Sequence, residues 1–230
     1  FSTENGAIPD CSNIIYAGLY WSGRSDVNAD GNADGDNDPN TFQVTKNGIT
    51  KNFDKRKVSI KGPLAANYTE VTAGASGVIA DPINIAYPSN GNQRNMFAGY
   101  AEITDYVKTN GIGEYFVADM ALREGHPDGT GYYGGWGMVI VYENSKMDWR
   151  DITVFDGHAY VTSGVASHTI DVSGFNSVQN GAVNLKLGVM AGEGDTPWTG
   201  DYFEILVPDG DDDQNDLTTL NNNSYQRLSH

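Results

Sequence analysis

The sequence predicts an all-β protein built as an antiparallel β-sandwich of the jelly-roll or Greek-key type. Its 230 residues include 28 glycines, a share that indicates many turns and few long helices. Short runs of apolar and β-branched residues recur from end to end, and Gly, Asn, Asp and Pro separate them. This spacing is typical of short strands in two packed sheets. Because no segment repeats at a period of about 20 to 50 residues, we expect one domain across residues 1–230.

The apolar runs give the expected strands in chain order. They cover residues 13–21, 41–46, 57–62, 67–73, 114–122, 136–143, 151–157, 158–163, 167–172, 182–191 and 201–207. The pair Asn47-Gly48 follows the second run and predicts a type I′ hairpin, because both central residues of that turn need positive φ. The run "GMVIVY" at 137–142 is apolar on both faces, which suits a strand buried between two layers.

One segment suggests a helix: residues 100–111, "YAEITDYVKTNG". Ile103, Tyr106 and Val107 would share one face, and Gly111 would end the helix after one or two turns. Residues 74–98 are expected to be a long connection between strands, as Greek-key and jelly-roll folds have.

The negative charge of the chain is concentrated in two short runs. The formal net charge is −16, and residues 26–38 and 209–216 each contain five aspartates and no basic residue. Without these ten aspartates, 20 acidic side chains remain against 14 basic ones. Such a chain should repel nucleic acid and anionic membranes, both of which need clustered Lys and Arg, but not divalent cations. No run approaches the roughly 20 apolar residues of a membrane-spanning helix, so direct membrane insertion is not expected.

The first acidic run, "SDVNADGNADGDNDPN" at 25–40, has the pattern of a calcium loop inserted between strands. Calcium takes six to eight oxygen ligands, and a short loop supplies them when alternate side chains carry oxygen and a glycine lets the chain curl. Asp26, Asn28 and Asp30 occupy positions 1, 3 and 5, and Gly31 occupies position 6. Asn37 stands at position 12, where a tight site has a bidentate glutamate.

A second frame overlaps the first and begins at Asp30, with Gly35 at its sixth position. Together the frames predict a weak extracellular structural site for Ca²⁺, completed by ligands from outside the loop, and the alternative is a solvated acidic loop. The second acidic run, at 208–216, has Gln214 where the glycine should be, so a solvated loop is favoured there over a second metal site. Residues 208–230 are expected to be loop or an incomplete domain end. The predicted calcium ligands are Asp26, Asn28, Asp30, Asn32, Asp34, Asp36 and Asp38.

Catalytic patterns are weak, and we expect no enzyme activity. Glu193 and Asp195 could form the acidic pair of a glycosidase, but a glycine-rich turn fits them equally well. The histidines have no metal or catalytic spacing and lie in turn or strand contexts. They are His126, His158, His168 and His230. Cys11 is the one cysteine, so an intrachain disulfide is impossible, which leaves both a cytosolic and a secreted location open.

Aromatic residues in glycine-rich segments suggest an alternative function, a carbohydrate-binding module with exposed aromatic platforms. Trp198, Tyr132 and Tyr133 could stack against the apolar faces of sugar rings. Trp136 begins an apolar run and is expected in the core.

Several segments, spread over residues 14–207, resemble one family. They are "YAGLYWSGR" (16–24), "YAEITDYV" (100–107), "GYYGGWGMVIVYEN" (131–144), "WRDITVFDGHAYV" (149–161), "LKLGVMAGEGD" (185–195) and "GDYFEI" (200–205). They resemble a module of the very large surface adhesins of gliding and other type IX secreting bacteria, the SprB-like gliding-motility adhesins.

This resemblance implies export across the outer membrane and display at the cell surface, attached to the outer membrane. It also implies attachment to surfaces or polysaccharide during gliding, and contact with other modules of the same long chain. No catalytic residues come with it. The expectation is therefore a non-catalytic, calcium-stabilised adhesin module, because a ligand that binds only the folded state stabilises a chain that lacks disulfides.

Overall fold

The computed structural model describes part of the chain, and its contacts divide the chain into two units, Phe1–Asn184 and Leu185–His230. The described residues are 11–26, 40–74, 83–86, 94–125, 132–157, 168–171, 173–174, 176, 180, 186–190, 202–205 and 218–221.

Strands predominate in the described residues, and every pair of strands is antiparallel. The all-β class predicted from the sequence is therefore confirmed. In chain order the elements are β1 (Ser12–Asp26), β2 (Thr41–Lys46), β3 (Ile49–Asp54), β4 (Lys57–Lys61), β5 (Thr69–Thr72), β6 (Ile83–Ala86), β7 (Arg94–Glu102), α1 (Thr104–Asn110), β8 (Phe116–Ala118), β9 (Tyr133–Asn144), β10 (Tyr202–Ile205) and β11 (Thr218–Asn221).

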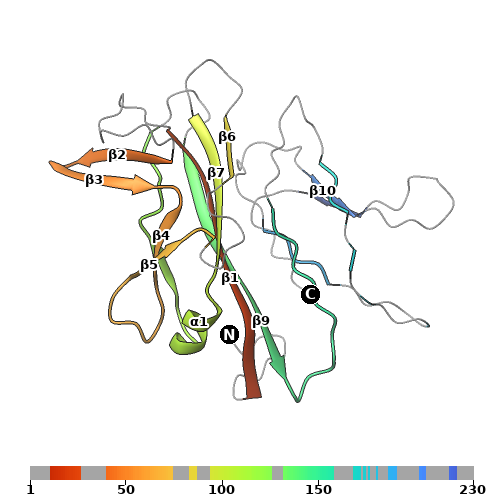
Figure 1. The fold of residues 1–230 in the computed structure, drawn as a ribbon. Coiled ribbons are helices and arrows are strands. Elements are labelled where there is room, and N and C mark those ends of the chain that lie inside the picture. Colours follow the sequence, from red (N-terminus) through yellow and green to blue (C-terminus); the bar gives the residue numbers. More distant parts are fainter. Residues whose placement is uncertain are drawn as a thin grey trace. The chain divides into compact units, whose positions relative to one another are not determined.

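The described strands of the first unit form three sheets (Figure 1). The largest has the order β6-β7-β1-β9, so the long strand β1 pairs with β7 on one side and with β9 on the other. A second sheet has the order β5-β4-β8, and β2 pairs with β3 in a hairpin. In the second unit, β10 pairs with β11.

Alternation along β1 produces the main core. Leu19 and Trp21 are buried and belong to one cluster with Phe97 of β7, Ile60 of β4 and Val107 of α1. Side chains at every second position of a strand share one face. The core therefore joins one face of the four-stranded sheet to α1 and to the inner face of β4.

The predictions of a hairpin at Asn47-Gly48 and of a short helix ending at Gly111 are confirmed. Asn47 and Gly48 have φ values of 53° and 77°, both positive as a type I′ turn requires. The helix α1 has seven residues and ends at Gly111, whose φ is 70° and whose N–H donates to the Val107 carbonyl at 2.8 Å.

The expectation of a long connection over 74–98 is wrong, because β6 and most of β7 lie in this range. The segment "RNMFAGYAE" gave a weak strand signal, since small residues interrupt its apolar alternation. Packing explains the glycine at position 99, because a Cβ there would lie under 3.0 Å from the Trp21 indole. The strand β11 was also not predicted.

Three predicted strands are not strands where the structure describes them. No strand forms at residues 151–157, 168–171 or 186–190, because no described neighbour pairs with their backbone. A strand is stabilised by its ladder with a neighbour, so apolar alternation alone does not make one. The predicted strand at 158–163 lies outside the described residues.

Candidate functional site

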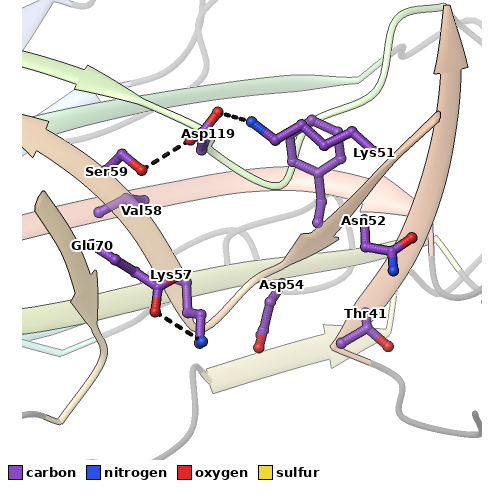
Figure 2. A pocket seen from close by; sticks show the side chains of 10 residues that line it. Thr41, Lys51, Asn52, Asp54, Lys57, Val58, Ser59, Glu70 and Asp119 are labelled. Atoms are coloured by element: carbon purple, nitrogen blue, oxygen red, sulfur yellow. Dashed lines mark hydrogen bonds and ion pairs between the residues drawn. The ribbon is translucent and has the colours of Figure 1, made fainter. Parts of the chain in front are cut away.

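A polar crevice of about 350 Å³ lies between the β2–β3 hairpin and the sheet β5-β4-β8 (Figure 2). Alternation along β4 turns Val58 and Ile60 into the core and leaves Lys57 and Ser59 on the opposite face, toward the crevice. Ser59 pairs with Glu70 of β5 on one side and with Ala118 of β8 on the other. The register therefore places Ser59 beside Glu70, and it places Asp119, the residue after Ala118, within hydrogen-bond distance of Ser59.

Asp119, which directly follows β8, is the most constrained residue of the crevice. Its carboxylate forms an ion pair with Lys51 of β3 and accepts a hydrogen bond from Ser59 Oγ at 2.9 Å (Figure 2). Its φ is 60°, a left-handed conformation that Asp tolerates better than most residues. The hydrogen bond from Lys51 lowers the pKa of Asp119 below its ordinary value. The carboxylate therefore has two partners, the Lys51 ammonium and the Ser59 hydroxyl, that favour its ionised form.

A second ion pair lies in the same crevice. Lys57 Nζ and the Glu70 carboxylate are 2.9 Å apart, and the hydrogen bond to Glu70 raises the pKa of Lys57. Asp54, at the end of β3, is held by Arg56, whose Nε and Nη2 donate to its two oxygens at 2.8 and 3.0 Å. Each charge in this part of the crevice therefore has a partner of opposite sign.

The remaining lining groups are mainly hydrogen-bonding groups, with little free aromatic surface. Asn52 accepts a hydrogen bond from Gln43 Nε2 at 2.9 Å, and Thr41 contributes a hydroxyl. The Phe53 ring has Phe42 at 5.9 Å between centroids and the Lys51 ammonium at 5.5 Å from its centroid. The crevice therefore offers donors and acceptors rather than an open stacking platform.

The outer face of the four-stranded sheet carries a second, apolar feature. This face is opposite to Leu19 and Trp21, and its groove of about 260 Å³ is lined by Ile15, Tyr16, Val141, Ile152 and Val154. Ile15, Ile152 and Val154 are exposed.

Three tyrosine hydroxyls meet on the same sheet. Tyr16 Oη and Tyr20 Oη share a hydrogen bond of 2.9 Å, and Tyr16 Oη donates to Tyr100 Oη at 3.1 Å. Burial, the largest cause, raises the pKa of Tyr16 to about 12 and also raises the pKa values of Tyr20 and Tyr100.

The predicted calcium loop lies mostly outside the described residues, although its ends are defined. Asp26 is the last residue of β1, and β2 begins at Thr41. Ser25 and Asn40, the first and last residues of the run at 25–40, are buried, and the Asn40 carbonyl accepts a hydrogen bond from the Lys55 N–H at 2.8 Å. The other predicted ligands, Asn28, Asp30, Asn32, Asp34, Asp36 and Asp38, lie outside the described residues.

Of the predicted sugar platforms and catalytic candidates, the structure describes Tyr132, Tyr133 and His168. Tyr132 and Tyr133 are half-buried at the start of β9, and Trp136, expected in the core, is 39% exposed. His168 is exposed. Trp198, His126, His158, His230, Glu193 and Asp195 lie outside the described residues.

Sequence reasoning did not identify the crevice. Lys57 and Glu70 are diagonal neighbours across the β4–β5 ladder, in which Lys57 pairs with Thr72 and Glu70 with Ser59. Their opposite charges are a signal that could be used only once this pairing was known, because long side chains interact across the diagonal. Lys51 and Asp119 are 68 residues apart, and no local pattern connects them.

Comparison of the chain with known proteins identifies no relative. The chain matches no protein-family model, no curated protein and no solved structure. Among the residues that the structure describes, no helix is long and apolar enough to cross a membrane. Within those same residues, no group of three or more His, Cys, Asp or Glu side chains could hold a metal ion.

Proposed function

We propose that this chain is a non-catalytic, calcium-stabilised β-sandwich module of a bacterial cell-surface adhesin. The observation that carries the proposal is the acidic loop at 25–40, with a glycine at the sixth position of each overlapping frame. Its ends join two strands, β1 and β2, so the loop is a strand-flanked insertion rather than part of a helix-loop-helix hand.

Calcium has a clear physical role in such a module. A metal that binds only the folded state contributes about 2.7 kcal/mol when its free concentration is about a hundredfold above Kd. Extracellular modules bind calcium with Kd values of about 10⁻⁴ to 10⁻³ M, which suits a loop without a bidentate glutamate at position 12. The ligands would be Asp26, Asn28, Asp30, Asn32, Asp34, Asp36 and Asp38, with others from outside the loop.

The apolar outer face of the four-stranded sheet supports the sandwich part of the proposal. Val141 and Ile15 line the groove on this face, and Ile152 and Val154 line the same groove. An apolar sheet face needs a second layer to remove it from water. Residues 151–157 would begin this layer, and the predicted strand at 158–163 would continue it, giving a sandwich of the jelly-roll or Greek-key type.

The location and partners follow from the resemblance to SprB-like gliding-motility adhesins. The module would be exported by type IX secretion and displayed at the cell surface, attached to the outer membrane. Its partners would be an extracellular surface or polysaccharide and other modules of the same long chain. Nucleic acid is not among them, because the net charge is −16.

Calorimetric titration with CaCl₂ tests the metal site directly. We expect the wild type to bind calcium with a Kd of about 10⁻⁴ to 10⁻³ M. The double variant Asp30→Ala/Asp34→Ala removes the carboxylates that both frames share, and it should lose this binding. The matched control, Asp211→Ala/Asp213→Ala, removes the same charge from the second acidic run and should bind as the wild type does. Equal binding by both double variants would contradict the assignment.

A further inference from the structure

We infer that the crevice between the β2–β3 hairpin and the sheet β5-β4-β8 binds an uncharged saccharide, with Lys51, Asp119, Lys57 and Glu70 as the main contacts. This site differs from the aromatic platforms expected from the sequence. The inference rests on the proposed adhesin function for its biological role and names the ligand class that such a module would contact.

The pairing of charges favours an uncharged ligand. Lys51 is paired with Asp119, and Lys57 with Glu70. An anionic ligand would compete with these carboxylates for the lysines, and a cationic ligand would compete with the lysines for the carboxylates. A neutral ligand leaves both ion pairs intact, so it binds without separating charges.

The hydrogen-bonding capacity that remains matches sugar hydroxyls. An ammonium group has three N–H donors and a carboxylate has about four acceptor positions, so one ion pair leaves several of each unused. Hydroxyl groups both donate and accept, and neighbouring hydroxyls on a sugar ring can meet a carboxylate and an ammonium at once. Hydrogen bonds to charged groups are stronger than those between neutral groups.

The size and shape of the crevice agree with a small ligand. Its volume of about 350 Å³ is near the lower end of the range of about 300 to 1,000 Å³ for small-molecule sites. The Phe53 ring lines the crevice but is half-buried, with Phe42 and the Lys51 ammonium beside it. The ligand would therefore be held mainly by hydrogen bonds at its edge rather than by stacking on its face.

Asp119 is organised in advance for such contacts. Its left-handed backbone and its bonds to Lys51 and Ser59 fix the carboxylate. Residues held in sparsely populated backbone regions cluster at ligand sites, where the surrounding structure over-determines them. A carboxylate that is already fixed loses little conformational entropy when a ligand binds.

The test uses the full chain in saturating calcium and measures binding of defined oligosaccharides by saturation-transfer NMR and titration. The neutral probes are cello-, malto- and xylo-oligosaccharides, and the anionic probe is an alginate oligosaccharide. We expect at least one neutral probe to bind with a Kd of about 1 to 10 mM, and more tightly than the anionic one. No neutral binding in this range, or a preference for alginate, would overturn the inference.

Matched variants assign the binding to the crevice. Asp119→Asn keeps a residue that tolerates the left-handed backbone but removes the ion pair, and it should weaken binding about tenfold or more. Glu124→Gln removes the exposed ion pair with Lys46 outside the crevice and should leave binding unchanged. Glu70→Gln is a second crevice variant and should also weaken binding. Unchanged affinity in both crevice variants would overturn the site.

The failure of this inference is distinguishable from failure of the calcium proposal. Sugar binding is measured on the folded chain, whereas the calcium proposal is measured by metal titration of the loop variants. A chain that binds calcium but no neutral saccharide would contradict the inference alone.

Discussion

The indole Nε1 of Trp21 donates a hydrogen bond of 3.0 Å to the backbone carbonyl oxygen of Lys55. Trp21 belongs to the central strand of the four-stranded sheet, and Lys55 lies in the turn between β3 and β4. Both residues are buried. This bond therefore connects the main sheet to the turn that joins two walls of the crevice.

Trp21→Phe should destabilise the protein because it leaves the buried Lys55 carbonyl without this donor. A buried polar group that loses its partner costs about 1 to 3 kcal/mol, and the smaller ring adds a packing loss. Denaturant unfolding measures the free energy. The control is Trp149→Phe, since Trp149 is 81% exposed and should tolerate the change. Equal effects of the two substitutions would show that the bond has no energetic importance.

Gly99→Ala should also destabilise the protein, by about 1 to 3 kcal/mol, because an added Cβ in a well-packed core forces neighbours to shift. At Gly99 this Cβ would meet the Trp21 indole. Gly135→Ala is the matched control in β9, where a Cβ meets nothing within 4 Å. Thermal unfolding should separate the two variants, and a Gly99→Ala protein as stable as Gly135→Ala would argue against this packing.

The tyrosine cluster predicts a loss of stability at alkaline pH. The folded pKa of Tyr16 is raised to about 12, above the ordinary value of about 10. Neutral Tyr16 therefore contributes stability that is fully present below about pH 10 and is lost as the pH rises through about 12. Tyr16→Phe should flatten the decline between these values in denaturant unfolding curves, and the exposed Tyr68→Phe controls for the loss of one phenol. A decline as steep in Tyr16→Phe as in the wild type would contradict this role.

The second layer over the main sheet is tested by a charge placed in the apolar groove. Val154 is exposed among the described residues, but the proposed second layer over this groove would bury it beside Ile15 and Val141. With that layer in place, Val154→Asp should cost about 1 to 3 kcal/mol, because the carboxylate leaves water. Thr153→Asp adds the same charge at the adjacent residue, which is exposed and does not line the groove, and it should have little effect. Denaturant unfolding gives both values. Similar stability of the two variants would mean that no layer covers this face.

Local signals in the sequence were sufficient for part of the fold. Asn47-Gly48 fixes its hairpin because only certain residues accept positive φ at both central positions. Gly111 ends α1 for a related reason. The strand β7 was not predicted, because Gly99 weakens its local strand pattern. A glycine is needed at this position to leave room for the Trp21 ring, which belongs to β1 and is far away in the sequence.

The crevice could not be predicted because its geometry depends on long-range pairing. The contact of Lys51 with Asp119 exists only after β3 and β8 are positioned by their own sheets. The loop at 25–40 is the reverse case, since its glycines and alternating oxygen ligands are readable from the sequence alone.

The most direct test of the proposed function is the thermal unfolding of the wild type in EDTA and in excess calcium. A stabilisation of about 2.7 kcal/mol corresponds to a Tm about 5 to 10 °C higher in calcium for a chain of this size. Asp30→Ala/Asp34→Ala should melt at one temperature in both conditions, whereas Asp211→Ala/Asp213→Ala should respond as the wild type does. A wild-type Tm that is the same in EDTA and in calcium would contradict the account.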